Sequence, residues 1–184
     1  SGTLKEAIPA IQYTIGQLTI SFSGRFINNG LFDVSNFNNG GYKIINNDTF
    51  KVNNYLRTFA WFDNNGVILN SDSIVTASGF VNNASGRIEA GLFRNFEGVE
   101  NYGAIYFSNL YDHQGFENRG FINITNNFYN SGYFLVPDFS NEGVIIIGND
   151  FLNDTDLGGD SGLFCVGGTS TNNGNMIGTF GFCD

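Results

Sequence analysis

The chain has 184 residues, a formal net charge of −9 and a pI near 4.3, and it contains 20 Phe, 8 Tyr and 25 Gly. This length fits one domain with a sizeable core, and the acidic balance with only scattered basic residues argues against nucleic acid as a partner. No apolar run approaches the roughly 20 residues that span a bilayer, so we expect no membrane insertion.

The first residues, 1–24, carry strand-like alternation without a repeated motif, and we expect them to cap the first coil of the fold. Helical signals are nearly absent. The single candidate for a helical turn, residues 4–11, is interrupted by Pro9.

A nine-residue motif, apolar–x–Asn–x–Gly–x–apolar–x–apolar, recurs from residue 26 onward. It is intact at 26–34, 99–107, 116–124, 128–136 and 139–147, and imperfect at 36–44, 62–70, 80–90 and 170–178. A strand–turn–strand unit repeated along most of a chain is the signature of a solenoid, whereas a propeller needs longer and more even repeats. We therefore predict one all-β domain over 1–184, a single-stranded, right-handed parallel β-helix (β-solenoid) with capped ends, whose roughly six to eight coils occupy residues 25–148.

The Asn and Gly of the motif have a structural explanation. In stacked coils Asn tolerates a left-handed corner, its side-chain amide can bond to the Asn above and below, and Gly lets the backbone pass close by. The motif assigns these corner roles to Asn28 and Gly30, Asn38 and Gly40, Asn64 and Gly66, Asn101 and Gly103, Asn118 and Gly120, Asn130 and Gly132, Asn141 and Gly143, and Asn172 and Gly174.

The densest titratable cluster is Asp112, His113, Glu117 and Arg119. A polysaccharide-active β-helix enzyme would use such carboxylates. The motif register sends Glu117 and Arg119 outward together, however, so an exposed ion pair explains them more simply. The string 159–162 (GDSG) echoes a serine-protease motif but lacks its context, and we interpret it as a Gly/Asp loop. We therefore predict no catalytic residues.

Residues 149–162 are acidic and Gly-rich, and we expect a loop that interrupts the coils. Asp154, Asp156 and Asp160 resemble a fragment of a calcium loop, but the third Asp/Asn before the Gly and the later Glu are missing. A solvated loop is favoured, with no metal and no cofactor.

Residues 163–184 hold the two cysteines, Cys165 and Cys183, and we expect a C-terminal cap stapled by their disulfide, against the alternative of two buried thiols. A disulfide would imply an extracellular compartment. N-glycosylation sequons occur at Asn47, Asn83, Asn123 and Asn153, about as many as chance supplies in so Asn-rich a chain.

Several aromatic residues fall at motif positions expected to face outward. Outward aromatics beside Asn and Asp suit carbohydrate contact or a fibre or partner interface, while stacking between coils is the simpler interpretation. They are included among Phe93, Phe96, Tyr102, Tyr106, Tyr111, Tyr129 and Tyr133, without all seven being assigned to the outside.

The repeated phrase, as in FINNGLFDV, FDNNGVILN, FENRGFINI and FSNEGVIII, resembles the N-terminal β-helical region of fungal adhesins of the hyphally regulated cell-wall protein family, over roughly residues 26–147. Bacterial haemagglutinin-type β-helices use similar corners and are the second choice. The resemblance implies a secreted, surface-displayed, non-enzymatic domain involved in adhesion or wall structure, and the sequons add the expectation of a glycoprotein. The family's Ser/Thr-rich stalk and lipid-anchor signal do not occur in these residues, so we expect an excised domain or a short secreted relative that assembles instead of being anchored.

Three functions follow as hypotheses. The first is a non-enzymatic cell-surface or cell-wall protein that acts in adhesion or wall structure, with cell-surface glycans or proteins as partners. The second is an extracellular structural subunit that associates with itself into fibres or matrix. The third is a polysaccharide-active β-helix enzyme.

Overall fold

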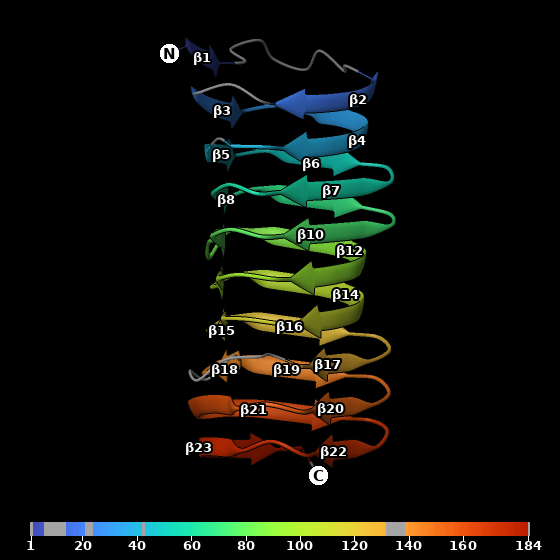
Figure 1. Ribbon diagram of the computed structural model, residues 1–184, viewed down its shortest axis with the longest axis vertical. Coiled ribbons are helices and arrows are strands. Elements are labelled where there is room, and N and C mark those ends of the chain that lie inside the picture. Colours follow the sequence, from blue (N-terminus) through green and yellow to red (C-terminus); the bar gives the residue numbers. More distant parts are fainter. Residues whose placement is uncertain (1, 6–13, 21–23, 42, 132–138, 184) are drawn as a thin grey trace.

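The structure, a computed structural model, describes residues 2–5, 14–20, 24–41, 43–131 and 139–183. In this part of the chain the fold is all-β, without a helix, and parallel strands stack into a β-solenoid of about eight turns (Figure 1). The prediction of a parallel β-helix is therefore confirmed.

Each turn passes through three strand positions, which we name face A, face B and face C. Face A holds β1 (Gly2–Lys5), β3 (Gly24–Asn28), β5 (Lys43–Asn46), β8 (Phe62–Asn64), β11 (Phe80–Asn82), β13 (Val99–Asn101), β15 (Phe116–Asn118), β18 (Phe139–Asn141) and the first parts of β21 (Leu157–Val166) and β23 (Met176–Phe182).

Face B holds β6 (Thr49–Val52), β9 (Val67–Asn70), β16 (Phe121–Ile124), β19 (Val144–Ile147) and the second parts of β21 and β23. Face C holds β7 (Tyr55–Thr58), β10 (Ser73–Thr76), β17 (Phe128–Asn130), β20 (Phe151–Asn153) and β22 (Ser170–Asn172). Four longer strands run through face B into face C, namely β2 (Thr14–Ile20), β4 (Phe32–Asn39), β12 (Arg87–Asn95) and β14 (Ala104–Asp112).

Equivalent residues of successive turns stand directly beside one another. Phe62 pairs with Phe80 and Asn64 with Asn82, 18 residues apart. The motif copies fall on more than one face, because the copies with Asn101 and Asn118 begin on face A and continue onto face B, while the copy with Asn130 begins on face C. This mixture explains the uneven glycine spacing in the sequence.

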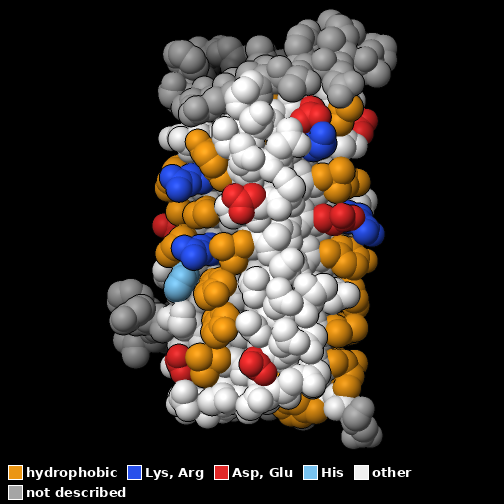
Figure 2. All heavy atoms as spheres, turned by 90° about the vertical axis from the view of Figure 1, so that its right-hand side faces the viewer, with side chains coloured by type: hydrophobic (Ala, Val, Ile, Leu, Met, Phe, Trp, Pro, Cys, Tyr) orange, Lys and Arg blue, Asp and Glu red, His pale blue; other side chains and the backbone are white. Residues whose placement is uncertain are grey.

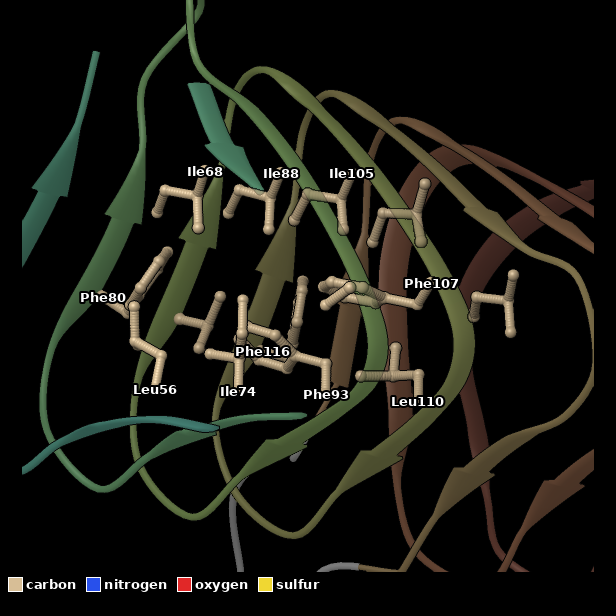
Figure 3. Close-up of a cluster of buried hydrophobic side chains, with 14 of the residues drawn as sticks. Leu56, Ile68, Ile74, Phe80, Ile88, Phe93, Ile105, Phe107, Leu110 and Phe116 are labelled. Atoms are coloured by element: carbon tan, nitrogen blue, oxygen red, sulfur yellow. The ribbon is translucent and has the colours of Figure 1, made fainter. Parts of the chain in front are cut away.

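The core is a set of rows of side chains that run along the solenoid axis. Period-two alternation sends every second residue inward, and the interior rings stack between turns, as in Phe62–Phe80, with centroids 5.1 Å apart, and Phe116–Phe139, 5.0 Å apart. Figure 3 shows one aliphatic row of face B, formed by Ile68, Ile88 and Ile105. Burial stabilises each such side chain by about 1.5–3 kcal/mol, and these rows fix the register of the turns.

The expectation of an acidic loop over 149–162 is wrong for much of that segment. Strand β20 pairs with β17, and the start of β21 pairs with β18. Gly158 and Gly159 occupy the positions of Ser140 and Asn141 in the preceding turn, so the coil continues without its usual Asn. Residues 163–183 likewise continue the coil, with β22 and β23 as the last described turn.

At the other end, β1 and β2 pair with β3 and β4. The described parts of residues 1–24, which were expected to form a cap, thus belong to the same parallel stack as the coils.

Candidate functional site

The motif asparagines of face A form one continuous buried ladder, which we name the inner ladder. In it the Nδ2 of each residue donates to the Oδ1 of its neighbour in the next turn over 2.7–2.8 Å, through Asn28, Asn46, Asn64, Asn82, Asn101, Asn118 and Asn141. Five of these residues are motif corners, while Asn46 and Asn82 were not assigned corner roles from the sequence. The left-handed conformation expected for these asparagines is wrong, because among the described non-glycine residues Ser161 alone has a positive φ, 75°.

Face C has a second buried ladder of mixed composition. Asn39 Nδ2 donates to Thr58 Oγ1 over 3.1 Å, and Asn130 Nδ2 to Asn153 Oδ1 over 2.7 Å. The ladder continues from Asn153 Nδ2 to Asn172 Oδ1 over 2.6 Å. The sequence placed the first of these corners one residue too early, at Asn38. Asn38 instead pairs with the outward Arg57, and the neighbouring Asn39 is the buried ladder residue.

The motif glycines mark places where neighbouring turns come too close for a side chain. A Cβ on Gly103, Gly120 or Gly143 would collide with the backbone oxygen of the glycine one turn earlier, and Gly66 and Gly174 meet the backbone of Asp48 and Thr155 in the same way. Gly30 donates its N–H to Asn28 Oδ1 over 3.4 Å, and Gly40 is an exposed corner residue. Gly132 lies outside the described residues.

The titratable cluster predicted from the sequence is divided by the wall of the solenoid. Asp112 is an inward ladder residue with no solvent exposure, and it accepts a hydrogen bond from Asn95 Nδ2 over 2.8 Å. His113 lies outside, where its ring stacks on Phe96 with centroids 4.8 Å apart. Burial and the nearby positive charge of Arg94 lower the pKa of His113. Asp112 therefore cannot reach a substrate that approaches from solvent.

Glu117 and Arg119 lie on the outer side of face A. An Arg119 Nη atom is 2.5 Å from Glu117 Oε1, and Arg119 Nε is 3.1 Å from Glu142 Oε2 in the next turn. This exposed ion-pair group corresponds to the simpler explanation offered from the sequence. The carboxylate of Glu100 accepts a hydrogen bond from the Tyr102 hydroxyl over 3.0 Å and raises the pKa of Tyr102.

The calcium candidates are separated by the coil geometry. Asp154 and Asp156 lie at the corner between β20 and β21, and their Oδ1 atoms accept hydrogen bonds from Asn173 and Asn175 over 2.8 and 2.7 Å. Asp160 lies farther along β21, opposite Thr179. Within the described residues, no group of three or more His, Cys, Asp or Glu side chains could hold a metal ion.

Cys165 and Cys183 form a disulfide on the outer side of face B, with their Cα atoms 4.8 Å apart. The bond links the last two turns of the described chain. Cys165 lies in β21 and Cys183 directly follows β23, where Phe164 pairs with Phe182, so the 18-residue separation of the cysteines is the length of one turn.

The four glycosylation candidates differ in access. Asn47 and Asn83 belong to an exposed ladder of corner amides, which we name the outer ladder, with Asn29 and Asn65. Its Nδ2 groups donate toward the N-terminus, opposite to the inner ladder. Asn123 lies on the outside of face B between Tyr106 and Ile146. Asn153 is buried in the ladder of face C, so glycosylation at Asn153 is incompatible with this fold.

The outward tyrosines stack on their neighbours along the axis. Tyr111 and Tyr129 have centroids 4.8 Å apart, and the guanidinium of Arg94 lies 5.5 Å from the Tyr111 ring. Tyr106 likewise contacts Phe121, with centroids 5.8 Å apart. Within the same aromatic set, the side chain of Phe93 points inward and is buried among the core rings, and Tyr133 lies outside the described residues.

Hydrophobic side chains gather in two columns along the solenoid in Figure 2. The strip between the columns consists mainly of backbone and uncharged polar side chains, with a few acidic side chains. The single histidine, pale blue in that view, lies beside one of these columns. Stacking between turns thus covers many aromatic ring faces while leaving ring edges and hydroxyl groups at the surface.

Three aromatic side chains at the corner between faces C and A are the most exposed of their kind near the middle of the solenoid. Phe59 is 52% exposed, Trp61 44% and Phe96 42%, and we name these three residues the corner patch. The sequence pointed to Phe96 but missed Phe59 and Trp61, which belong to no motif copy. Phe59 directly follows the ladder residue Thr58, and Trp61 lies two residues later. The outward direction of this corner can be recognised only once the register of the turns is known.

Comparison with family models, with curated proteins and with solved structures finds no match to this chain. None of the described residues forms a helix that is long and apolar enough to cross a membrane. Functional inference therefore depends on the chain's own surface, and the corner patch is its best-defined candidate site.

Proposed function

We propose that this chain is a non-enzymatic module of a cell-surface or cell-wall protein, and that it acts in adhesion or wall structure outside the cell. The corner patch is the observation that carries the proposal. Exposed aromatic side chains on a rigid frame lose little conformational entropy when a ligand binds, and the buried ladders and core rows provide that frame.

The extracellular part of the proposal is supported by the disulfide between Cys165 and Cys183, since such bonds persist in oxidising compartments. Asn47, Asn83 and Asn123 lie at the surface and are the sites at which we propose glycosylation. The resemblance to fungal adhesins agrees with this location.

The test is a binding assay with the purified chain. We expect the monomeric protein to be retained on immobilised cell-wall polysaccharides or on intact cells, without releasing reducing sugar from them. Sugar release that disappears in His113→Ala or Glu117→Gln variants would favour the enzyme hypothesis instead. A failure to bind any polysaccharide or cell surface would refute adhesion.

The last described turn supports self-association as a second candidate function. Strands β22 and β23 each pair with one neighbouring strand among the described residues, and Met176, Ile177 and Phe182 are exposed there. Exposed apolar side chains of this kind favour association with another chain. Filaments in electron micrographs that disappear in a Phe182→Ser variant would support this function, and a monomer at all concentrations in sedimentation would oppose it.

A further inference from the structure

The corner patch owes its arrangement to a column of residues that succeed one another turn by turn. Each backbone N–H in this column donates to the carbonyl oxygen of the ladder residue one turn earlier, over 2.9–3.0 Å, for Phe59, Ala77, Phe96 and His113. Two aromatic residues, Phe59 and Phe96, therefore stand on either side of one alanine.

This order places only the small side chain of Ala77 between two aromatic positions, one turn before it and one turn after it. Neighbouring parallel strands lie about 4.8 Å apart, so Phe59 and Phe96 arise from backbones about 9.6 Å apart. That separation is about twice the 4.5–5 Å between the centroids of closely stacked rings. One face of Phe96 is covered by His113, with an angle of 14° between the ring planes, while the neighbour on its other side is the methyl group of Ala77.

Trp61 lies beside this column in a fixed orientation. Its indole Nε1 donates a hydrogen bond to Asp63 Oδ1, and its ring packs over Gly79, where a Cβ would collide with the indole. Lys43 Nζ lies 2.7 Å from Asp63 Oδ2 and 5.6 Å from the indole centroid. The exposed indole is thus pre-organised by three polar or small neighbours, and binding does not have to order it.

The size and rim of the patch indicate the class of ligand. Aromatic side chains of 150–250 Å² that are about half exposed offer roughly 100 Å² each, well below the ~800 Å² per partner of a stable protein interface. The surrounding positions are polar or small, with Ser78 and the exposed Glu97 next to the column. A flat ring with an apolar face and a hydrogen-bonding edge matches this surface.

We propose that the corner patch binds a pyranose ring of a glycan, with one face of the sugar against Phe96 and a neighbouring sugar against Trp61. The hydroxyl groups at the sugar edge would face Ser78, Glu97 and the Lys43–Asp63 pair. This inference rests on the adhesion function proposed above and names its site and ligand class.

Trp61 is the sole tryptophan of the chain, so tryptophan emission, excited beyond the absorption band of the 8 tyrosines, reports on this site alone. The experiment titrates the full chain with short oligosaccharides of β-1,3-linked glucose, α-linked mannose and N-acetylglucosamine. We expect a saturable change of the tryptophan emission with at least one of the three, at concentrations that match its retention on the corresponding immobilised polysaccharide.

Two variants test the geometry. Phe96→Ala removes one aromatic surface, and Ala77→Leu places a bulky side chain between the two aromatic positions without removing any aromatic group, so each should weaken binding at least tenfold. The matched control is Ile146→Ala, because Ile146 is 38% exposed but lies on face B, away from the patch. The control should bind like the wild type, and all three variants should keep the wild-type circular dichroism spectrum.

The outcomes separate this inference from the function on which it rests. Retention on a polysaccharide with no change of tryptophan emission, and with no effect of either variant, overturns the corner site but leaves adhesion standing. Binding to deglycosylated surface proteins with no response to any of the sugars overturns the ligand class. An absence of binding to every sugar and surface refutes both proposals together.

Discussion

Two adjacent asparagines, Asn64 and Asn65, offer a matched test of what the ladders contribute to stability. Asn64 belongs to the buried inner ladder, where it accepts from Asn46 Nδ2 and donates to Asn82 Oδ1, each over 2.8 Å. Asn65 belongs to the outer ladder, where it donates to Asn47 Oδ1 over 2.8 Å and accepts from Asn83 Nδ2 over 2.7 Å. The two residues thus make equivalent ladder bonds and differ mainly in burial.

The Asn64→Ala substitution should destabilise the fold strongly. It leaves the buried Asn82 Oδ1 without its ladder donor, at a cost of about 1–3 kcal/mol, and it removes hydrogen bonds of Asn64 itself worth about 1 kcal/mol net. Asn46 Nδ2 keeps its bond to Asp48 O over 2.9 Å, which limits the loss. We therefore expect a decrease of about 2–4 kcal/mol in the free energy of unfolding. For Asn65→Ala, water replaces the lost partners, and we expect a change within about 0.5 kcal/mol.

Urea denaturation followed by the fluorescence of Trp61, which lies in the same turn, measures both variants directly. Thermal melting provides a second measurement, and Asn64→Ala should lower Tm by roughly 4–16 °C for a chain of this size. Equal destabilisation by the two substitutions would refute the reasoning, because it would mean that burial of the inner ladder does not determine its contribution.

Three further predictions concern other features of the coil. Asp112→Asn should raise the free energy of unfolding by about 1 kcal/mol in urea denaturation, because it supplies an amide donor toward the buried Asn130 Oδ1, which accepts no hydrogen bond from the described residues. His113 should titrate below 6.5 by NMR; since its neutral form is favoured in the folded state, stability should fall as pH drops below 6.5 toward the folded pKa, and His113→Gln should remove that decrease. Cys183→Ser should release the last turn, with faster hydrogen exchange in β23 and a local loss of up to about 3 kcal/mol.

The alternation of apolar residues with the recurring Asn and Gly was enough to predict the fold class, because every turn repeats the same inward pattern. The register on face C was harder to predict. Its ladder position holds Asn39, Thr58, Thr76, Asn95 or Asp112 in successive turns, so no single residue type marks it. Because asparagines stand at both 38 and 39, the sequence leaves open which of the two belongs to the ladder. Side chains alternate between the two faces of a strand, so a shift of one residue exchanges the buried asparagine for the outward one.

The candidate site could be predicted only in part. Phe96 follows the ladder residue Asn95 by one position, just as Phe59 follows Thr58, but the two lie far apart in the sequence. Stacking of the turns places them two strands apart. The small residues Ala77 and Gly79 lie in the turn between them, and their role beside the aromatic residues can be seen only when the register is known. Periodicity along one strand carries no information about neighbours across turns.

The opposite directions of the two amide ladders have an electrical consequence. Each chain of side-chain amides is a line of aligned dipoles, and over the turns from Asn28 to Asn83 the two lines run antiparallel and largely cancel along the axis. Beyond Asn83 the inner ladder continues to Asn141, and the face C bonds from Asn130 through Asn153 to Asn172 donate in the same direction, with their N–H ends directed toward the C-terminal half. The axial field is therefore uneven, and its positive end points toward the turn that carries Asp154 and Asp156.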